Sequence, residues 1–220
     1  MEKTVAILMA DLSGFTAMTE IHGPEAAAEM IETYTALVKK SLRGESFMLE
    51  RVGDQVVVIS PDPDDLAETA LALFDISENE NHFLAIHAGL HYGTVLDLDG
   101  HYYGSAVNLT SRIAAKARKG KILCSKDFVD ALSNTAAFRY AYHGSVNFKN
   151  IFESKEIVEL LPIKSNSQAG KNLCPVCHMR LDATEISFSY RQDDHWFYFC
   201  SEECKMVFEK YQLYNVSLAS

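Results

Sequence analysis

The stretch TVAILMADLSGFT, residues 4–16, decides the fold of this chain. Its first part, residues 4–10, is a short apolar run, and a run of this length predicts a buried strand. The run ends on Asp11, so the sequence predicts a carboxylate at the end of a buried strand. Taken alone, Asp11 has an ordinary alternative role as the N-cap of a following helix.

Strands and helices alternate along the rest of the first 163 residues. Gly53 and Asp54 separate two apolar runs and predict a hairpin with a tight turn. Asp54 therefore has its own ordinary alternative as a turn residue. The mixed order predicts an α+β fold, a central sheet with helices over it. Strands are expected at 4–10, 47–52, 55–59, 83–92, 93–98, 121–124, 143–148 and 156–161, and helices at 24–40, 64–74, 107–117 and 126–132.

The composition and charge of the chain exclude several classes of function. The 220 residues are 48% apolar and 23% charged, values typical of a soluble globular protein. Lys and Arg number 20 against 30 Asp and Glu, and a net charge of −10 argues against a general nucleic-acid binder. No apolar run approaches the roughly 18 residues of a membrane span. Residues 1–15 lack the basic region of a signal peptide, and Asp11 interrupts their apolar stretch too early for one. We therefore expect a cytoplasmic protein.

A polar segment divides the chain. Residues 164–171, KSNSQAGK, are small and polar without apolar periodicity, which predicts a linker. The expected domains are therefore 1–163 and 172–220. Cysteines are concentrated in the second domain, whereas Cys124 stands alone on an apolar strand and is expected to be a buried packing residue.

Six short segments of the first domain form a pattern when they are read in their order along the chain. They are ADLSGFT (10–16), RVGD (51–54), GLHYG (89–93), GSAVNLTSR (104–112), GKIL (120–123) and NFKN (147–150). In this order they resemble the class III nucleotidyl cyclases, the adenylyl and guanylyl cyclases, over nearly all of residues 4–161. The resemblance implies a ferredoxin-like cyclase homology domain with a mostly antiparallel sheet.

The same resemblance assigns the metal ligands. It implies that Asp11 and Asp54, with the backbone carbonyl of Leu12, bind two Mg²⁺ or Mn²⁺ ions. Hard oxygen ligands suit these ions. One ion would lower the pKa of the ribose 3′-hydroxyl for in-line attack on the α-phosphorus, and both would offset phosphate charge.

The resemblance also assigns the residues that hold the nucleotide. Asn108 matches the residue that orients the ribose, and Arg112 matches the arginine that stabilises charge on the transferring phosphoryl group. Lys149 matches the lysine that holds the terminal phosphates, and Lys121 lies where a second phosphate-binding cation is found. The implied product is a 3′,5′-cyclic nucleotide plus pyrophosphate, made by a homodimer with shared active sites.

Two positions depart from the adenylyl cyclase pattern and bear on the choice of base. Glu50 and His101 stand where adenylyl cyclases carry Lys and Asp. A carboxylate at position 50 accepts from the N1–H and N2–H₂ donors of guanine, and His101 can donate to O6. The sequence therefore favours GTP over ATP. The alternative is that both side chains point to solvent and the base is selected loosely.

The second domain carries a metal-ligand pattern. Cys174 and Cys177 form a C-x2-C pair, and Cys200 and Cys204 form a C-x3-C pair. Four thiolates at this spacing suit one tetrahedral Zn²⁺, although a pair of disulfides or free thiols is the alternative. The region resembles the YHS domain, a treble-clef-like metal-binding module. That family usually has Gly at the position of His178, which is therefore an extra ligand or a surface residue.

Three functions remain open at this point. The first is a homodimeric cyclase in signal transduction with an appended zinc module. The second is a metal or redox sensor whose cyclase fold only binds nucleotide. The third is a docking protein that uses the small domain to reach a signalling complex.

Overall fold

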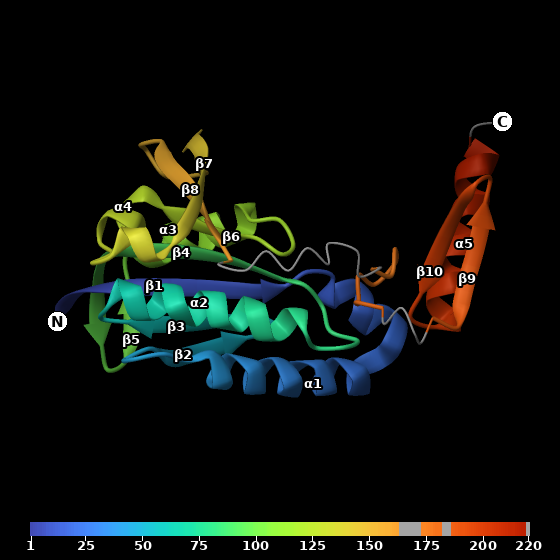
Figure 1. Ribbon diagram of the computed structural model, residues 1–220, viewed down its shortest axis with the longest axis horizontal. Helices are drawn as coiled ribbons and strands as arrows, with labels where there is room; N and C mark the ends of the chain where they lie inside the picture. Colours follow the sequence, from blue (N-terminus) through green and yellow to red (C-terminus); the bar gives the residue numbers. More distant parts are fainter. Residues whose placement is uncertain (163–172, 182–185, 219–220) are drawn as a thin grey trace. The chain divides into compact units, whose positions relative to one another are not determined.

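The computed structural model describes residues 1–162, 173–181 and 186–218 (Figure 1). The chain forms two compact units. The first contains Met1–Leu12, Tyr34–Glu78 and Ile86–Ser165, and the second contains Ser13–Thr33, Asn79–Ala85 and Asn166–Ser220. The predicted linker at 164–171 lies outside the described residues, so the predicted domain boundary stays a prediction.

An eight-stranded sheet forms the first unit, with the order β2-β3-β1-β4-β6-β8-β7 and β5 paired to β4. Neighbouring strands are antiparallel except β4 and β6, which run parallel. The predicted α+β class is confirmed. The strands are β1 (Glu2–Leu12), β2 (Phe47–Val52), β3 (Gln55–Ser60), β4 (Ile86–Leu98), β5 (His101–Tyr103), β6 (Ile122–Ser125), β7 (Arg139–Val146) and β8 (Lys155–Leu161).

Helices accompany this sheet, and none in the described part of the chain has the length and apolar character that a membrane span requires. They are α1 (Phe15–Ser41), α2 (Pro63–Glu78), α3 (Ser105–Lys116) and α4 (Lys126–Asp130), with a 3₁₀ turn η1 (Thr135–Ala137). Further along the chain, β9 (Phe188–Gln192) and β10 (His195–Phe199) form a two-stranded sheet that is followed by α5 (Glu202–Leu218). The ring of Phe208 on α5 packs on Phe197 and Phe199 of β10.

α1 contains more than the helix that the sequence predicts over 24–40. Gly23 breaks the helical backbone, with φ 85° and ψ 176°. Pro24 follows the break, and proline is well suited to the first position of a helix because it lacks the N–H that would be unpaired there. The segment Phe15–His22 before the break is helical as well, which the sequence analysis missed.

β4 is one strand where the sequence predicts two, over 83–92 and 93–98. Gly93 remains paired with Val5 of β1, so it is not a turn. A Cβ at Gly93 would lie 3.0 Å from the Cβ of Ala106 on α3. The glycine therefore marks the close approach of a helix to the strand.

The core lies on both faces of β1. Val5, Ile7 and Met9 share a buried cluster with Ala106 and Ala114 of α3. The alternating residues point to the opposite face, and they are buried as well: Ala6, Leu8 and Ala10 have no exposed surface. Cys124 is buried as predicted, and burial raises the pKa of its thiol.

Gly89 is expected to tolerate no side chain. A Cβ there would lie 2.2 Å from the backbone nitrogen of Ala114 and 2.8 Å from the carbonyl oxygen of Thr110, both on α3. Since a helix backbone cannot yield locally, Gly89→Ala should lower the free energy of unfolding by about 3 kcal/mol, measured by urea denaturation. Gly120→Ala is the control: it meets no atom but has φ +75°, so strain alone should cost about 1 kcal/mol. Equal losses in the two variants would contradict the steric explanation.

Candidate functional site

The two candidate metal ligands of the first unit lie at neighbouring strand ends. Val56 of β3 pairs with Ala10 of β1, so the turn that carries Asp54 lies beside the end of β1 that carries Asp11. The guanidinium of Arg51 donates to the carbonyl oxygen of Gly53, which holds this turn. The structure thus brings Asp11 and Asp54 together, and the two carboxyl groups are within hydrogen-bonding contact.

The proximity of the two carboxyl groups makes it unfavourable for both to be ionised. Burial, the hydrogen bond with Asp11 and the charge of Asp11 together raise the pKa of Asp54 to about 6. Two like charges at this separation favour a proton or a cation between them. The donor chemistry, two carboxylates beside the carbonyl of Leu12, fits Mg²⁺ or Mn²⁺.

Two further residues face the acidic pair and were missed in the sequence. His87 pairs with Asp11 across β1 and β4, and its Nε2 lies 4.0 Å from the Oδ2 of Asp11. Burial lowers the pKa of His87, while the charge of Asp54 opposes this shift. Tyr34 of α1 is fully buried, and burial together with the charges of Asp11 and Asp54 raises the pKa of its hydroxyl. Only the strand register, which the sequence does not show, reveals His87.

The predicted nucleotide-binding residues lie on the surface of the first unit. Asn108 and Arg112 are exposed on α3, one helical turn apart. Within the described chain, no hydrogen bond or ion pair joins them to the acidic pair. The other predicted residues of this group, Glu50, His101 and Lys149, are also exposed.

Lys121 has a partner that the sequence did not indicate. Its Nζ lies 2.7 Å from Oε1 of Glu159, and the other carboxylate oxygen lies 2.8 Å from Nε2 of His143. Burial raises the pKa of Glu159, but the hydrogen bonds from Lys121 and His143 outweigh it and lower the pKa. Lys121 therefore neutralises a buried carboxylate in this structure.

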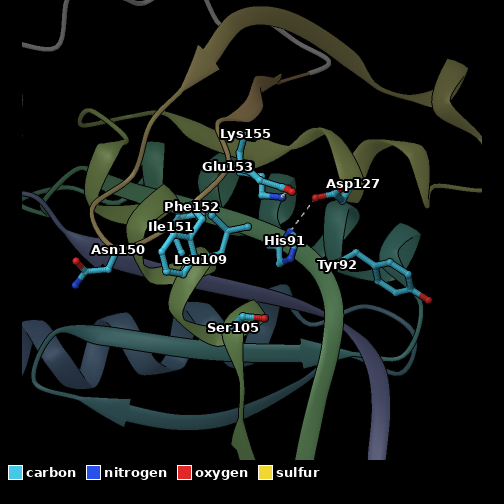
Figure 2. Close-up of a pocket in the computed structure, with 10 residues that line it drawn as sticks. All are labelled: His91, Tyr92, Ser105, Leu109, Asp127, Asn150, Ile151, Phe152, Glu153 and Lys155. Carbon is cyan, nitrogen blue, oxygen red and sulfur yellow. Dashed lines mark hydrogen bonds and ion pairs between the residues drawn. The ribbon is translucent and has the colours of Figure 1, made fainter.

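A cavity of about 570 Å³ lies beside the helix that carries Asn108 and Arg112 (Figure 2). Ser105 and Leu109 of α3 line one part of it, and the segment from Asn150 to Lys155 lines another. His91, Tyr92 and Asp127 complete the lining.

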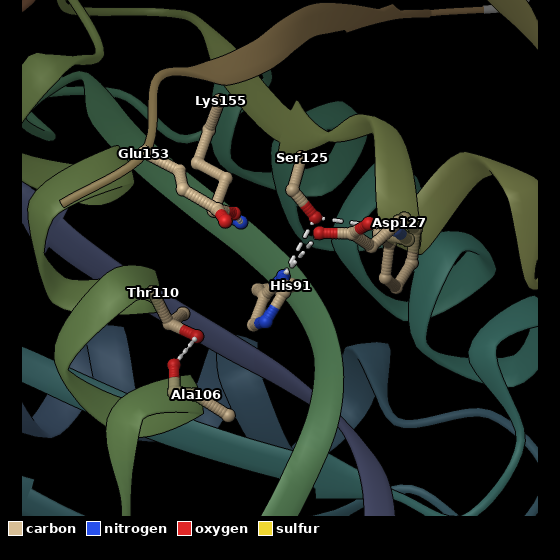
Figure 3. A network of polar contacts seen from close by, with 8 residues as sticks. His91, Ala106, Thr110, Ser125, Asp127, Glu153 and Lys155 are labelled. Carbon is tan, nitrogen blue, oxygen red and sulfur yellow. Dashed lines mark hydrogen bonds and ion pairs between the residues drawn. The ribbon is translucent and has the colours of Figure 1, made fainter. Parts of the chain in front are cut away.

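The buried His91 joins this cavity to the sheet (Figure 3). Its Nδ1 lies 2.7 Å from Oγ of Ser125 and 3.9 Å from Oδ2 of Asp127. Burial lowers the pKa of His91, and the charge of Asp127 opposes the shift. The same Ser125 hydroxyl accepts a hydrogen bond from the backbone N–H of Phe128 and caps α4. The contact between His91 and Ser125 therefore has a structural role.

The predicted zinc ligands gather in the second unit. The sulfur of Cys200 lies 3.3 Å from that of Cys177 and 3.5 Å from that of Cys204. Cys174 is near enough to the three other thiols to be influenced by them, but its sulfur is not among the ligand atoms that all lie within 4.8 Å of one another. These neighbours, first Cys177, lower the pKa of Cys174, and Cys174 raises the pKa of Cys200, so the four thiols cannot ionise together without a cation.

His22 joins this cluster from α1. One ring nitrogen of His22 and the sulfurs of Cys177, Cys200 and Cys204 all lie within 4.8 Å of one another, and this group could hold a metal ion. No local pattern in the sequence signals this role, because His22 and Cys200 are 178 residues apart. His178, the extra ligand that the sequence analysis considered, is not in the group.

Comparison with known sequences identifies the first 161 residues, which include the segments 13–33 and 79–85 of the second unit. Residues 1–161 match the family model of the adenylate and guanylate cyclase catalytic domain. An uncharacterised protein of Mycobacterium tuberculosis is 35% identical over 147 residues, 66% of this chain and 38% of that protein. A pH-sensitive adenylate cyclase of the same species is 27% identical over 152 residues, 68% of this chain and 38% of that protein. The chain thus spans less than two fifths of the length of these relatives.

Solved structures show the same fold. An adenylate cyclase from Trypanosoma brucei in its monomeric state superposes with a TM-score of 0.68 at 16% identity, covering 82% of this chain and 94% of that chain. The guanylate cyclase domain of RhGC from Catenaria anguillulae, in complex with GTP, superposes with a TM-score of 0.63 at 18% identity, covering 74% and 100%.

Asp54→Asn is expected to stabilise the metal-free protein at pH 7.5. Because the folded-state pKa is raised from 3.8 to about 6, the protonated carboxyl favours the fold, and this contribution is lost as the pH rises through about 6. The neutral amide should therefore gain about 1 kcal/mol, after a reduction for solvent screening of this half-exposed group. Thermal unfolding in a chelator at pH 7.5 and pH 5 measures the effect.

The gain should fall to roughly half at pH 5, where the folded carboxyl is mostly protonated but the unfolded one is still ionised, and should vanish only below the ordinary pKa of 3.8. Asp99→Asn, an exposed change in the turn between β4 and β5, is the control and should alter neither value. A destabilised Asp54→Asn at pH 7.5 would contradict the repulsion between the two carboxylates.

Proposed function

Because the chain belongs to the adenylate and guanylate cyclase catalytic domain family, we propose that it is a nucleotidyl cyclase. It converts a nucleoside triphosphate to the 3′,5′-cyclic nucleotide and pyrophosphate, in intracellular signal transduction. The observation that carries the proposal is the contact between the carboxyl groups of Asp11 and Asp54 at neighbouring strand ends.

Asp11, Asp54 and the carbonyl of Leu12 hold two divalent cations in this proposal. Mg²⁺ or Mn²⁺, when bound, supplies Lewis acidity toward the ribose 3′-hydroxyl and positive charge toward the phosphates. The raised pKa of Asp54 supports the assignment. Two carboxylates without a counter-ion repel each other, and a cation between them removes this repulsion. His87, on the strand beside Asp11, lies next to the ligands, with its Nε2 4.0 Å from the Oδ2 of Asp11.

Asn108, Arg112 and Lys149 contact the nucleotide. Their exposure on the surface of one chain supports a site completed by a second copy. Arg112 stabilises negative charge on the transferring phosphoryl group, Asn108 orients the ribose and Lys149 holds the terminal phosphates. A symmetric homodimer then contains two equal sites, each with the acidic pair of one protomer and the α3 residues of its partner.

Asp54→Ala and Arg112→Ala should each abolish turnover, since either change damages both sites of a homodimer. Mixing the two variants should restore up to about a quarter of wild-type activity. Random pairing makes half of the dimers mixed, and each mixed dimer has one intact site of two. Cyclic nucleotide production with Mn²⁺ is the measurement, and size-exclusion chromatography with differently tagged chains verifies mixing. Absence of recovery in verified mixed dimers would refute the shared site.

GTP is the proposed preferred substrate. Glu50 on β2 and His101 on β5 are both exposed and available to a base. A carboxylate meets the two donors of guanine but opposes the N1 acceptor of adenine. The relatives include a protein named adenylate cyclase, and a solved structure of the same fold holds GTP, so ATP is the competing substrate.

The ratio of kcat/KM for GTP and ATP decides the base. A mismatch of this kind costs about 1–3 kcal/mol, or roughly 5- to 150-fold in selectivity, so GTP should be favoured within that range. The double variant Glu50→Lys, His101→Asp should move the ratio toward ATP. Glu45→Lys, at an exposed acid before β2, makes the same change of charge as Glu50→Lys alone and is the control that should leave the ratio unchanged. An ATP preference above about tenfold in the wild type would overturn the GTP assignment.

The cysteine cluster is proposed to bind one Zn²⁺ ion. Cys174, Cys177, Cys200 and Cys204 are the ligands that the spacing indicates, in a YHS-like treble-clef module. Soft thiolates select zinc over the hard cations of the cyclase site. The mutual contacts of the thiols support the assignment.

A further inference from the structure

The placement of His22 calls for an explanation beyond the spacing of the cysteines. Its Nε2 lies 3.5 Å from the sulfur of Cys200 and 3.6 Å from the sulfur of Cys204. Together with Cys177, these residues form a group whose ligand atoms all lie within 4.8 Å of one another.

The distances match those around a tetrahedral zinc ion. With Zn–S of about 2.3 Å and Zn–N of about 2.0–2.1 Å, tetrahedral angles separate nitrogen from sulfur by about 3.6 Å. The two His22 distances, 3.5 and 3.6 Å, agree with this value. The same geometry separates two sulfurs by about 3.8 Å, and the observed 3.3 and 3.5 Å are slightly shorter.

The local backbone holds His22 in this position. His22 is the last residue before the break at Gly23, so it ends the first segment of α1. At the other end of the segment, Gly14 approaches the Cys174–Cys177 turn so closely that a Cβ would lie 2.8 Å from the carbonyl oxygen of Cys177. The segment between them is about 12 Å long, and both of its ends contact the cysteine-bearing chain.

The C-x2-C turn is attached to the chain around residue 84 as well. Leu84 and Met179 form a β-bridge, and the backbone N–H of Arg180 donates to the carbonyl oxygen of Phe83 at 3.1 Å. The cysteines therefore meet two segments that belong to the cyclase sequence, 13–33 and 79–85, within the second compact unit.

We propose that His22 is a zinc ligand and that it occupies the fourth position beside Cys177, Cys200 and Cys204. The inference rests on the proposed zinc site and changes one of its ligands: the imidazole replaces Cys174, the remaining thiol of the cluster. The ion then joins the start of α1 to the C-terminal segment. The zinc site is thus assembled from both ends of the chain.

The full-length chain, loaded with Co²⁺ in place of Zn²⁺, tests the ligand set. Imidazole gives a stronger ligand field than thiolate, so an S₃N site absorbs at shorter wavelength than an S₄ site. The wild type should show the S₃N spectrum and, when purified with Zn²⁺, one zinc per chain by elemental analysis. His22→Cys should retain the metal and move the bands to longer wavelength. His22→Asn should weaken zinc binding by more than about 100-fold in competition with a chromophoric chelator.

Two matched variants complete the experiment. Cys174→Ser should keep the wild-type cobalt spectrum, and His178→Asn, which changes the histidine next to Cys177, should keep both the spectrum and the affinity. Circular dichroism verifies that each variant is folded. If Cys174→Ser loses a thiolate band while His22→Asn retains the wild-type spectrum, the site is Cys₄ and the inference is wrong. If the wild type binds neither zinc nor cobalt, the proposed zinc site fails and the inference fails with it.

Discussion

The antiparallel pairing of β1 with β4 is the constraint on which the chemistry of the first unit depends. The register runs from Glu2 opposite Leu96 to Leu12 opposite Ile86. A shift by one residue would turn every side chain of β1 to the other face of the sheet. Both faces of β1 are buried, and the side chains on the two faces differ in size, so such a shift would leave gaps on one face and crowding on the other. The core thereby fixes the place of Asp11, next to His87 and beside the turn of Asp54.

The position that the core dictates is unfavourable for two bare carboxylates. Asp11 and Asp54 repel each other, and partial burial weakens the screening by water. The fold tolerates this because the apolar strands on which they lie contribute far more than the repulsion costs. In the proposed site a divalent cation would relieve the repulsion, so the packing that stabilises the sheet would also favour a metal at its edge. The two aspartates thus lower the stability of the metal-free fold, and the same repulsion favours the binding of a metal in the proposed function.

Local patterns in the sequence predict local structure here, and they fail where distant segments meet. The apolar run at 4–10, the turn at Gly53 and Asp54 and the helix over 24–40 follow from periodicity and turn chemistry, and the structure contains all three. His87 became visible only through the strand register, and His22 only through a contact across 178 residues. Glu159, the partner of Lys121, lies on β8, which pairs with β6. No local pattern in the sequence indicates that these two strands are paired. The motifs therefore indicated two aspartates that the structure brings close together, but they did not indicate the residues that surround each site.

The two proposed metal sites differ in the hardness of their ligands, and this difference keeps their ions apart. Asp11, Asp54 and a carbonyl present only oxygen, which Mg²⁺ and Mn²⁺ prefer. Sulfur and imidazole nitrogen at Cys200, Cys204 and His22 bind zinc far more strongly than these hard ions. In the proposed assignment, zinc is therefore expected at the sulfur and imidazole ligands, and a hard divalent cation at the oxygen ligands.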